Sequence, residues 1–163
     1  MPDQETIERA QQDKQEGKSP STQAGEFVRE EIEHVREGKH GARSTQQAIA
    51  IGLSKARRAG VKLPVPKKAS ARTRKSARRA SAAARTKKRP SKTRSRAITR
   101  ALKREGHSAA SRSALSKQAR SAARKRSAAS RSAAARQAAR TKGPRARSAA
   151  ARKAARTRAR RKK

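Results

Sequence analysis

The chain has 163 residues, of which 48 are lysine or arginine and 11 are aspartate or glutamate, for a net charge of +37. Only 31% of the residues are hydrophobic, with one phenylalanine and no tryptophan, tyrosine or cysteine. This composition excludes a large single-core enzyme, a disulfide scaffold and a cysteine-ligated metal site, because it supplies neither enough apolar surface nor any thiol.

Two helices are predicted in the first part of the chain. The first covers residues 4–16 and is only weakly apolar on one side. The second covers residues 23–37, where Val28, Ile32 and Val35 recur at i, i+4 and i+7. Each is followed directly by a glycine, the residue that most often ends a helix.

A third helix has the clearest signals. Ser44 with Gln47 three residues later forms a capping box at its start. Ile49 and Leu53 lie on its apolar face, and Gly60 supplies a left-handed cap at its end. These helices predict a small all-α head over residues 1–63. Because its large apolar side chains are few, we expect self-association or a protein partner through the head helices.

The composition changes at residues 64–66, where the sequence Pro-Val-Pro forbids continuation of a helix. Residues 67–163 contain 37 Lys/Arg, 29 Ala, 14 Ser and 6 Thr, and only three large apolar residues. Such a segment has nothing with which to build a core, while its like charges repel along a helix. The predicted fold class is therefore a small helical head followed by a long, low-complexity basic tail that is intrinsically disordered when free. Because alanine, arginine and lysine favour helix, we expect the tail to become helical when bound, with breaks near Pro90, Gly106 and Gly143-Pro144.

The charges are divided unevenly between the two regions. Residues 1–37 carry ten acids and five bases, whereas residues 38–163 carry 43 bases and one acid. A polycation of this density predicts binding to a phosphate polymer by release of condensed counterions, without base-specific contacts. We expect the nucleic-acid contacts to come from the clustered cations of the tail, namely Arg72, Arg74, Lys75, Arg78, Arg79, Arg85, Lys87, Lys88, Arg89, Arg120, Arg124, Lys125, Arg126, Arg136, Arg140, Arg152, Lys153, Arg156, Arg160 and Arg161.

No pattern predicts catalysis, a metal or a cofactor. The histidines at 34, 40 and 107 are scattered along the sequence and read as exposed polar positions. Glu30, Glu33 and Glu37 read as surface charges of a helix, because no apolar pocket is present to shift a pKa. We therefore expect a protein that is not an enzyme.

Two runs of the head carry a resemblance. They are GKSPSTQAGEF over residues 17–27 and GKHGARSTQQAIAIGLSKARRAG over residues 38–60. Over about residues 15–65 the chain resembles a family of small bacterial proteins of unknown function, sometimes labelled plasmid stabilisation proteins. The resemblance brings no active site. The tail resembles bacterial linker-histone-like tails in composition only.

Together these features predict a histone-like, nucleoid-associated bacterial protein that binds DNA without sequence specificity and compacts or bridges it. The resemblance of the head further implies a link to plasmid maintenance. The alternative is a basic RNA-binding or ribosome-assembly factor. No window approaches about 18 apolar residues, so we expect no membrane span and no membrane partner. The acidic, apolar-poor start predicts no secretory signal and hence a cytoplasmic location.

Overall fold

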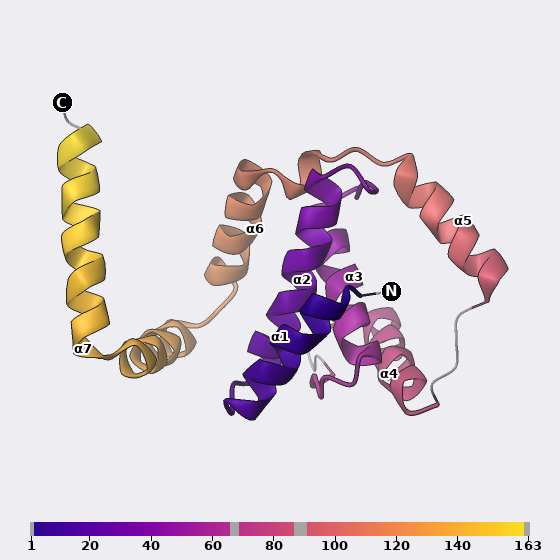
Figure 1. Ribbon diagram of the computed structural model, residues 1–163, viewed down its shortest axis with the longest axis horizontal. Coiled ribbons are helices and arrows are strands. Elements are labelled where there is room, and N and C mark those ends of the chain that lie inside the picture. Colours follow the sequence, from indigo (N-terminus) through magenta and orange to yellow (C-terminus); the bar gives the residue numbers. More distant parts are fainter. Residues whose placement is uncertain (1, 66–68, 87–90, 162–163) are drawn as a thin grey trace. The chain divides into compact units, whose positions relative to one another are not determined.

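A computed structural model describes residues 2–65, 69–86 and 91–161, and all regular structure within these ranges is helical. The helices in chain order are α1 (Gln4–Gln15), α2 (Pro20–Arg36), α3 (Thr45–Arg58), α4 (Ala71–Thr86), α5 (Lys92–Lys103), the 3-10 turn η1 (Ser108–Ala110), α6 (Arg112–Arg124) and α7 (Ala128–Arg161) (Figure 1). The chain forms two compact units, residues 1–118 and residues 119–163, and each is described by itself. None of the described helices is long and apolar enough to cross a bilayer.

The prediction of a disordered tail is wrong. The described part of residues 67–163 is occupied by α4, α5, η1, α6 and α7, so it is not an intrinsically disordered, low-complexity tail. Helix propensity outweighs the repulsion between like charges, because alanine loses no side-chain entropy and each repulsive pair costs only tenths of a kcal/mol. Serine side chains add caps, accepting hydrogen bonds from the backbone N–H three residues later: Ser70 at the start of α4, Ser111 at α6 and Ser127 at α7.

The three helices predicted in the head are present. α3 begins at the predicted cap, where Ser44 Oγ accepts a 3.2 Å hydrogen bond from the Gln47 N–H. The Gln47 side chain accepts in return from the N–H of Arg43, one residue before the cap. At the other end Gly60 adopts φ +94°, and the Val61 N–H reaches the Ala56 carbonyl at 3.0 Å, so the predicted left-handed cap is confirmed.

α2 packs against both α1 and α3 (Figure 1). The crossing with α3 is close at Gly52, where a Cβ atom would lie 2.7 Å from Val28 Cα and 2.9 Å from the Phe27 carbonyl oxygen. Only a residue without a side chain allows the two backbones this separation. Phe27, almost fully buried, then packs with Ala10, Ala24 and Ala56 in one of the two core clusters of the unit.

The second core cluster joins the head to the predicted tail. Ile32 and Val35 of α2 and Ala48 of α3 pack against Ala109 and Ala110 of η1. Arg36 Nε and the Thr45 hydroxyl donate hydrogen bonds to the carbonyls of Ala110 and Ala109, at 2.9 and 2.7 Å. The segment that follows α5 therefore completes the core of the first unit.

A backbone contact at Gly41 holds this segment in place. The N–H groups of Gly41 and Ala42 donate to the carbonyls of Leu102 and Gly106, at 2.9 and 3.0 Å. A Cβ on Gly41 would overlap the Glu105 carbonyl, so glycine is required at this position. The loop between α2 and α3 is thus paired with the end of α5.

The second unit, residues 119–163, consists of the last residues of α6 and the whole of α7. Its described side chains are almost all exposed, so these helices depend on local propensity rather than on a core. α7 is interrupted at Gly143, with φ 68° and ψ 168°, and Pro144 follows. The break predicted at Gly143-Pro144 is confirmed, as is the one at Gly106, between α5 and η1. The break predicted at Pro90 lies outside the described residues.

Candidate functional site

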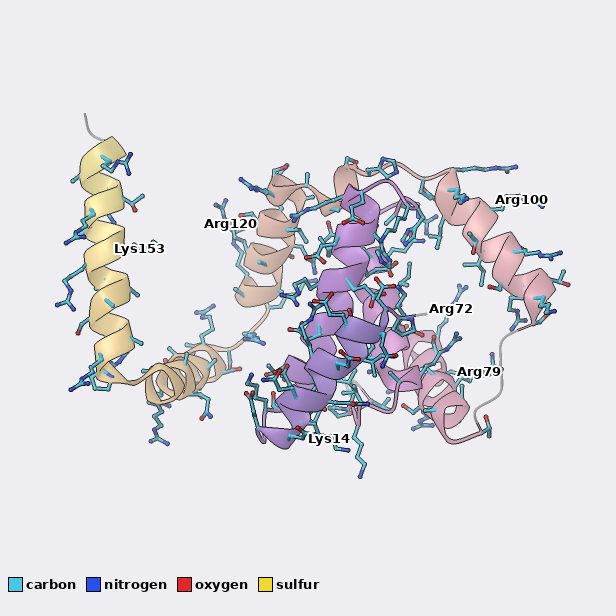
Figure 2. All side chains as sticks on the ribbon, in the orientation of Figure 1. Lys14, Arg72, Arg79, Arg100, Arg120 and Lys153 are labelled. Carbon is cyan, nitrogen blue, oxygen red and sulfur yellow. The ribbon has the colours of Figure 1, made fainter. Side chains whose placement is uncertain are left out.

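The cations predicted on α4 share one exposed surface. Ala77 and Ala80 of this helix are buried, and α4 packs against α3. The basic side chains point away from that contact and are exposed, as Figure 2 shows for the labelled Arg72 and Arg79; the others are Arg74, Lys75 and Arg78. Burial of the small alanines therefore fixes which side of α4 presents its charges.

α5 adds exposed cations that the sequence analysis did not single out. Arg94, Arg96, Arg100 and Lys103 are all exposed, and Arg100 is labelled in Figure 2. The sequence also indicates that these cations are exposed, because the same alternation of basic and small residues runs through α5. Its one large apolar residue exposed to solvent is Ile98, with 54% of its surface accessible.

In the second unit the predicted cations are distributed around the helices. Residues 119–163 contain 18 Lys/Arg and no acid. The exposed predicted residues are Arg120, Arg124, Lys125, Arg126, Arg136, Arg140, Arg152, Lys153, Arg156 and Arg160, of which Arg120 and Lys153 are labelled in Figure 2. Several stand four residues apart on one helix, where like charges repel and would be stabilised by an anionic partner.

Some of the predicted contacts lie outside the part of the chain that the structure describes. Lys87, Lys88 and Arg89 lie outside the described residues, as do the side chains of Arg85 and Arg161. The head residues singled out have structural roles. Ser44 and Gln47 cap α3, Ile49 is half-buried, Leu53 packs on the core cluster around Phe27, and Gly60 ends the helix.

A buried ionic cluster that the sequence did not predict lies between α2 and α3. Glu30 and Glu31 of α2 are 3% and 0% exposed. Lys55 Nζ of α3 lies 2.8 Å from Glu30 Oε1 and 2.8 Å from Glu31 Oε2. Glu30 Oε2 also accepts a 3.1 Å hydrogen bond from the Asp3 N–H. The prediction that Glu30 is a surface charge is wrong.

Two histidines complete this cluster. His34 Nε2 lies 3.1 Å from Asp3 Oδ2, and His40 Nε2 lies 3.3 Å from Glu31 Oε1. The two rings meet edge to face, with 6.2 Å between their centroids. Neither ring is exposed, since only 12% and 16% of these side chains are accessible, so the prediction of scattered, exposed histidines is wrong for this pair. His107, by contrast, is exposed.

The cluster shifts the pKa of two groups. Burial alone would lower the pKa of Lys55, but its contacts with the Glu30 and Glu31 carboxylates overcome this effect and raise the pKa. A hydrogen bond from His34 lowers the pKa of Asp3. Both shifts favour the charged forms that the ion pairs require.

The position of Glu31 held a signal for this burial. It lies four residues after Phe27 and four before Val35, on the face of α2 that forms the core. A carboxylate in register with an apolar stripe predicts a buried ion pair, although its charge alone would suggest exposure.

Residues 12–69 match the model of a family described as a family of unknown function (DUF6496). The match takes in α2, α3 and the end of α1, so it supports the resemblance of the head to a family of unknown function. The family's description names no activity, and it supports neither plasmid stabilisation nor a histone-like tail. No curated protein and no solved structure shows a significant match.

Proposed function

We propose that the chain binds DNA without sequence specificity through the exposed cations of α4 to α7. The observation that supports this proposal is the density of exposed Lys and Arg on these helices. The one acid after residue 37 is Glu105, which lies between α5 and η1. Each phosphate that a cation neutralises releases condensed counterions, and this release drives association. Arginine, the more frequent base of these helices, also offers a planar fork that can hold a phosphate by two hydrogen bonds.

The arrangement of the charges favours contact with the sugar–phosphate backbone of DNA over recognition of base edges. A helix with its side chains is about 10–12 Å across, which matches the major groove of about 12 Å. Base reading needs a few side chains held in one groove at fixed positions, whereas the cations of α7 point in all directions around the helix. Cations on every side also allow a helix to touch two duplexes, so the proposal includes bridging and compaction. A nucleoid location and a role in plasmid maintenance are parts of the same proposal.

The test is the salt dependence of binding by the full chain. Fluorescence anisotropy with two duplexes of equal length and different sequence should give equal affinities. The affinity should fall by about 10³-fold or more between about 50 and 200 mM salt, as expected for at least six neutralised phosphates. An affinity that is insensitive to salt, or the absence of binding at low salt, would overturn the proposal.

RNA is the second candidate, because phosphate contacts do not distinguish the two polymers. A competition between duplex DNA and a structured RNA at equal phosphate concentration separates them. Preference for the duplex supports DNA as the ligand, and preference for the RNA supports an RNA-binding or ribosome-assembly role. Self-association through the head helices stays a prediction, and light scattering by the full chain tests it.

A further inference from the structure

His40 faces two acceptors at once. Its Nδ1 lies 3.1 Å from the Gly41 carbonyl oxygen, and its Nε2 lies 3.3 Å from Glu31 Oε1. A neutral imidazole carries one N–H, so a ring that donates to Gly41 turns a lone pair toward the carboxylate. Two lone pairs at this distance repel unless a cation or a second proton lies between them.

The Glu31 carboxylate needs a further partner. Both of its oxygens are fully buried, and Oε1 makes no hydrogen bond in the described structure. Lys55 Nζ lies 2.8 Å from Oε2 as an ion pair, so Oε1 is the oxygen left facing His40. A buried carboxylate oxygen with only a lone pair opposite it is costly.

The cluster also carries an excess of negative charge. Asp3, Glu30 and Glu31 carry three negative charges, and Lys55 supplies one positive charge. With neutral imidazoles the group has a net charge of −2, which one divalent cation would neutralise.

The donor atoms have the arrangement of a metal site. One ligand atom from each of Glu31, His34 and His40 lies within 4.8 Å of the other two. The 3.3 Å between His40 Nε2 and Glu31 Oε1 is the separation of about 3.3 Å that two ligands have when each lies about 2.0–2.1 Å from a tetrahedral zinc.

Outer partners orient both rings as they do in zinc proteins. With a metal bound to Nε2 of His40, the Nδ1 proton of this ring would go to the Gly41 carbonyl, 3.1 Å away. With the metal bound to Nδ1 of His34, the Nε2 proton of that ring would go to the Asp3 carboxylate, also 3.1 Å away. Metal-bound imidazoles donate their other N–H to a carbonyl or carboxylate in this way. Imidazole and carboxylate donors together favour zinc over magnesium or calcium, which prefer oxygen ligands alone.

We propose that Glu31, His34 and His40 bind one zinc ion, which ties the loop after α2 to the helix itself. Three protein ligands leave a fourth position for water. The site is independent of the cationic helices, so it stands or falls apart from the proposed DNA binding.

The test uses the metal-free full chain, without added histidines, titrated with Zn²⁺ or with Co²⁺ as a coloured substitute. We expect one ion per chain, the visible absorption of tetrahedral cobalt, and a rise in the unfolding midpoint with zinc, because the ion binds the folded state. His34→Gln and His40→Gln should abolish this binding. Asp3→Asn should weaken it by about 10-fold or more, as expected for an outer partner. His107→Gln, which removes the third histidine of the chain, should leave it unchanged.

A measurement on the unmodified chain covers the case in which the variants do not fold. The imidazole ¹⁵N resonances of His34 and His40 should shift when zinc is added, and those of His107 should not. No binding at millimolar zinc, equal binding in the His34→Gln and His40→Gln variants when folded, or a shift confined to His107 would overturn the proposal.

Discussion

The hydroxyl of Thr45, at the start of α3, donates a 2.7 Å hydrogen bond to the carbonyl oxygen of Ala109, 64 residues later in the chain. Both residues are buried, at 7% exposure each. The bond, together with the neighbouring one from Arg36 to Ala110, attaches η1 to the head. η1 thus belongs to the first compact unit, which extends to Gln118.

Replacement of this hydroxyl should loosen the attachment. Thr45→Val keeps the shape of the side chain but leaves the Ala109 carbonyl without its partner, at a cost of about 1–2 kcal/mol. Hydrogen exchange should become faster at the Ala110 and Leu115 amides, which close the turns around η1. Thr93→Val, an exposed position of α5, is the matched control and should leave these rates unchanged.

The close crossing of α2 and α3 predicts opposite effects for two glycines. Gly52→Ala should lower the free energy of unfolding by about 1–3 kcal/mol, because the new Cβ meets the backbone of Val28 and the helices must separate. Gly25→Ala, in the same helix pair but with open space around it, should raise the free energy by about 0.5–1 kcal/mol through helix propensity. Urea unfolding of the full-length variants measures both. Equal effects at the two positions would contradict the close approach.

Lys55 should dominate the stability of the ionic cluster. Lys55→Met removes the ammonium between two buried carboxylates and should cost about 3 kcal/mol at neutral pH. Lys39→Met, at an exposed pair with Glu37, should cost less than about 1 kcal/mol.

The raised pKa of Lys55 also sets a pH dependence. A group whose folded pKa lies above its unfolded value contributes stability that is fully present below the unfolded value, about 10.4 for lysine, and is lost as the pH rises through the folded value. The unmodified chain should therefore lose stability at strongly alkaline pH. The Lys55→Met variant should lose less over the same range, as thermal unfolding at several pH values would show.

Removal of two cations should change the salt dependence of DNA binding only when these cations lie on the helices proposed to contact DNA. The double variant Arg156→Ala/Arg160→Ala, on the exposed end of α7, should make the slope of log affinity against log salt shallower by up to about 2. Arg29→Ala/Lys39→Ala removes the same charge from the head, where both residues pair with acids, and should change the slope little. Equal slopes for the two double variants would count against the assignment of the contacts to α7.

The caps of the second unit should control its helicity. Ser127→Ala removes the oxygen that accepts the Ser130 N–H at the start of α7, at a cost of about 1 kcal/mol. Because this helix has no core to hold it, the loss should appear directly as fraying in amide hydrogen exchange over the first turns. Ser132→Ala, an exposed interior position of α7, should instead strengthen the helix, since alanine is the better helix former.

The amino-acid sequence by itself determined the features that depend on neighbours along the chain. The caps at Ser44 and Gly60, the break at Gly143-Pro144 and the division of charge could all be predicted, because each is set within a few residues. The disorder of the tail was predicted wrongly from the same local information. The helix propensity of alanine and the serine caps together outweigh the repulsion between like charges.

The tertiary structure alone decided where the small and the charged residues lie. Ala48, Ala109 and Ala110 lie in a core cluster. The sequence does not indicate their burial, because alanine, unlike a large apolar residue, is equally common on exposed helices. His40 meets Glu31 and His34 of α2 because the loop after this helix turns back on it. Burial of such residues depends on which backbones approach each other, and glycine and alanine permit that approach while leaving almost no hydrophobic signal in the sequence.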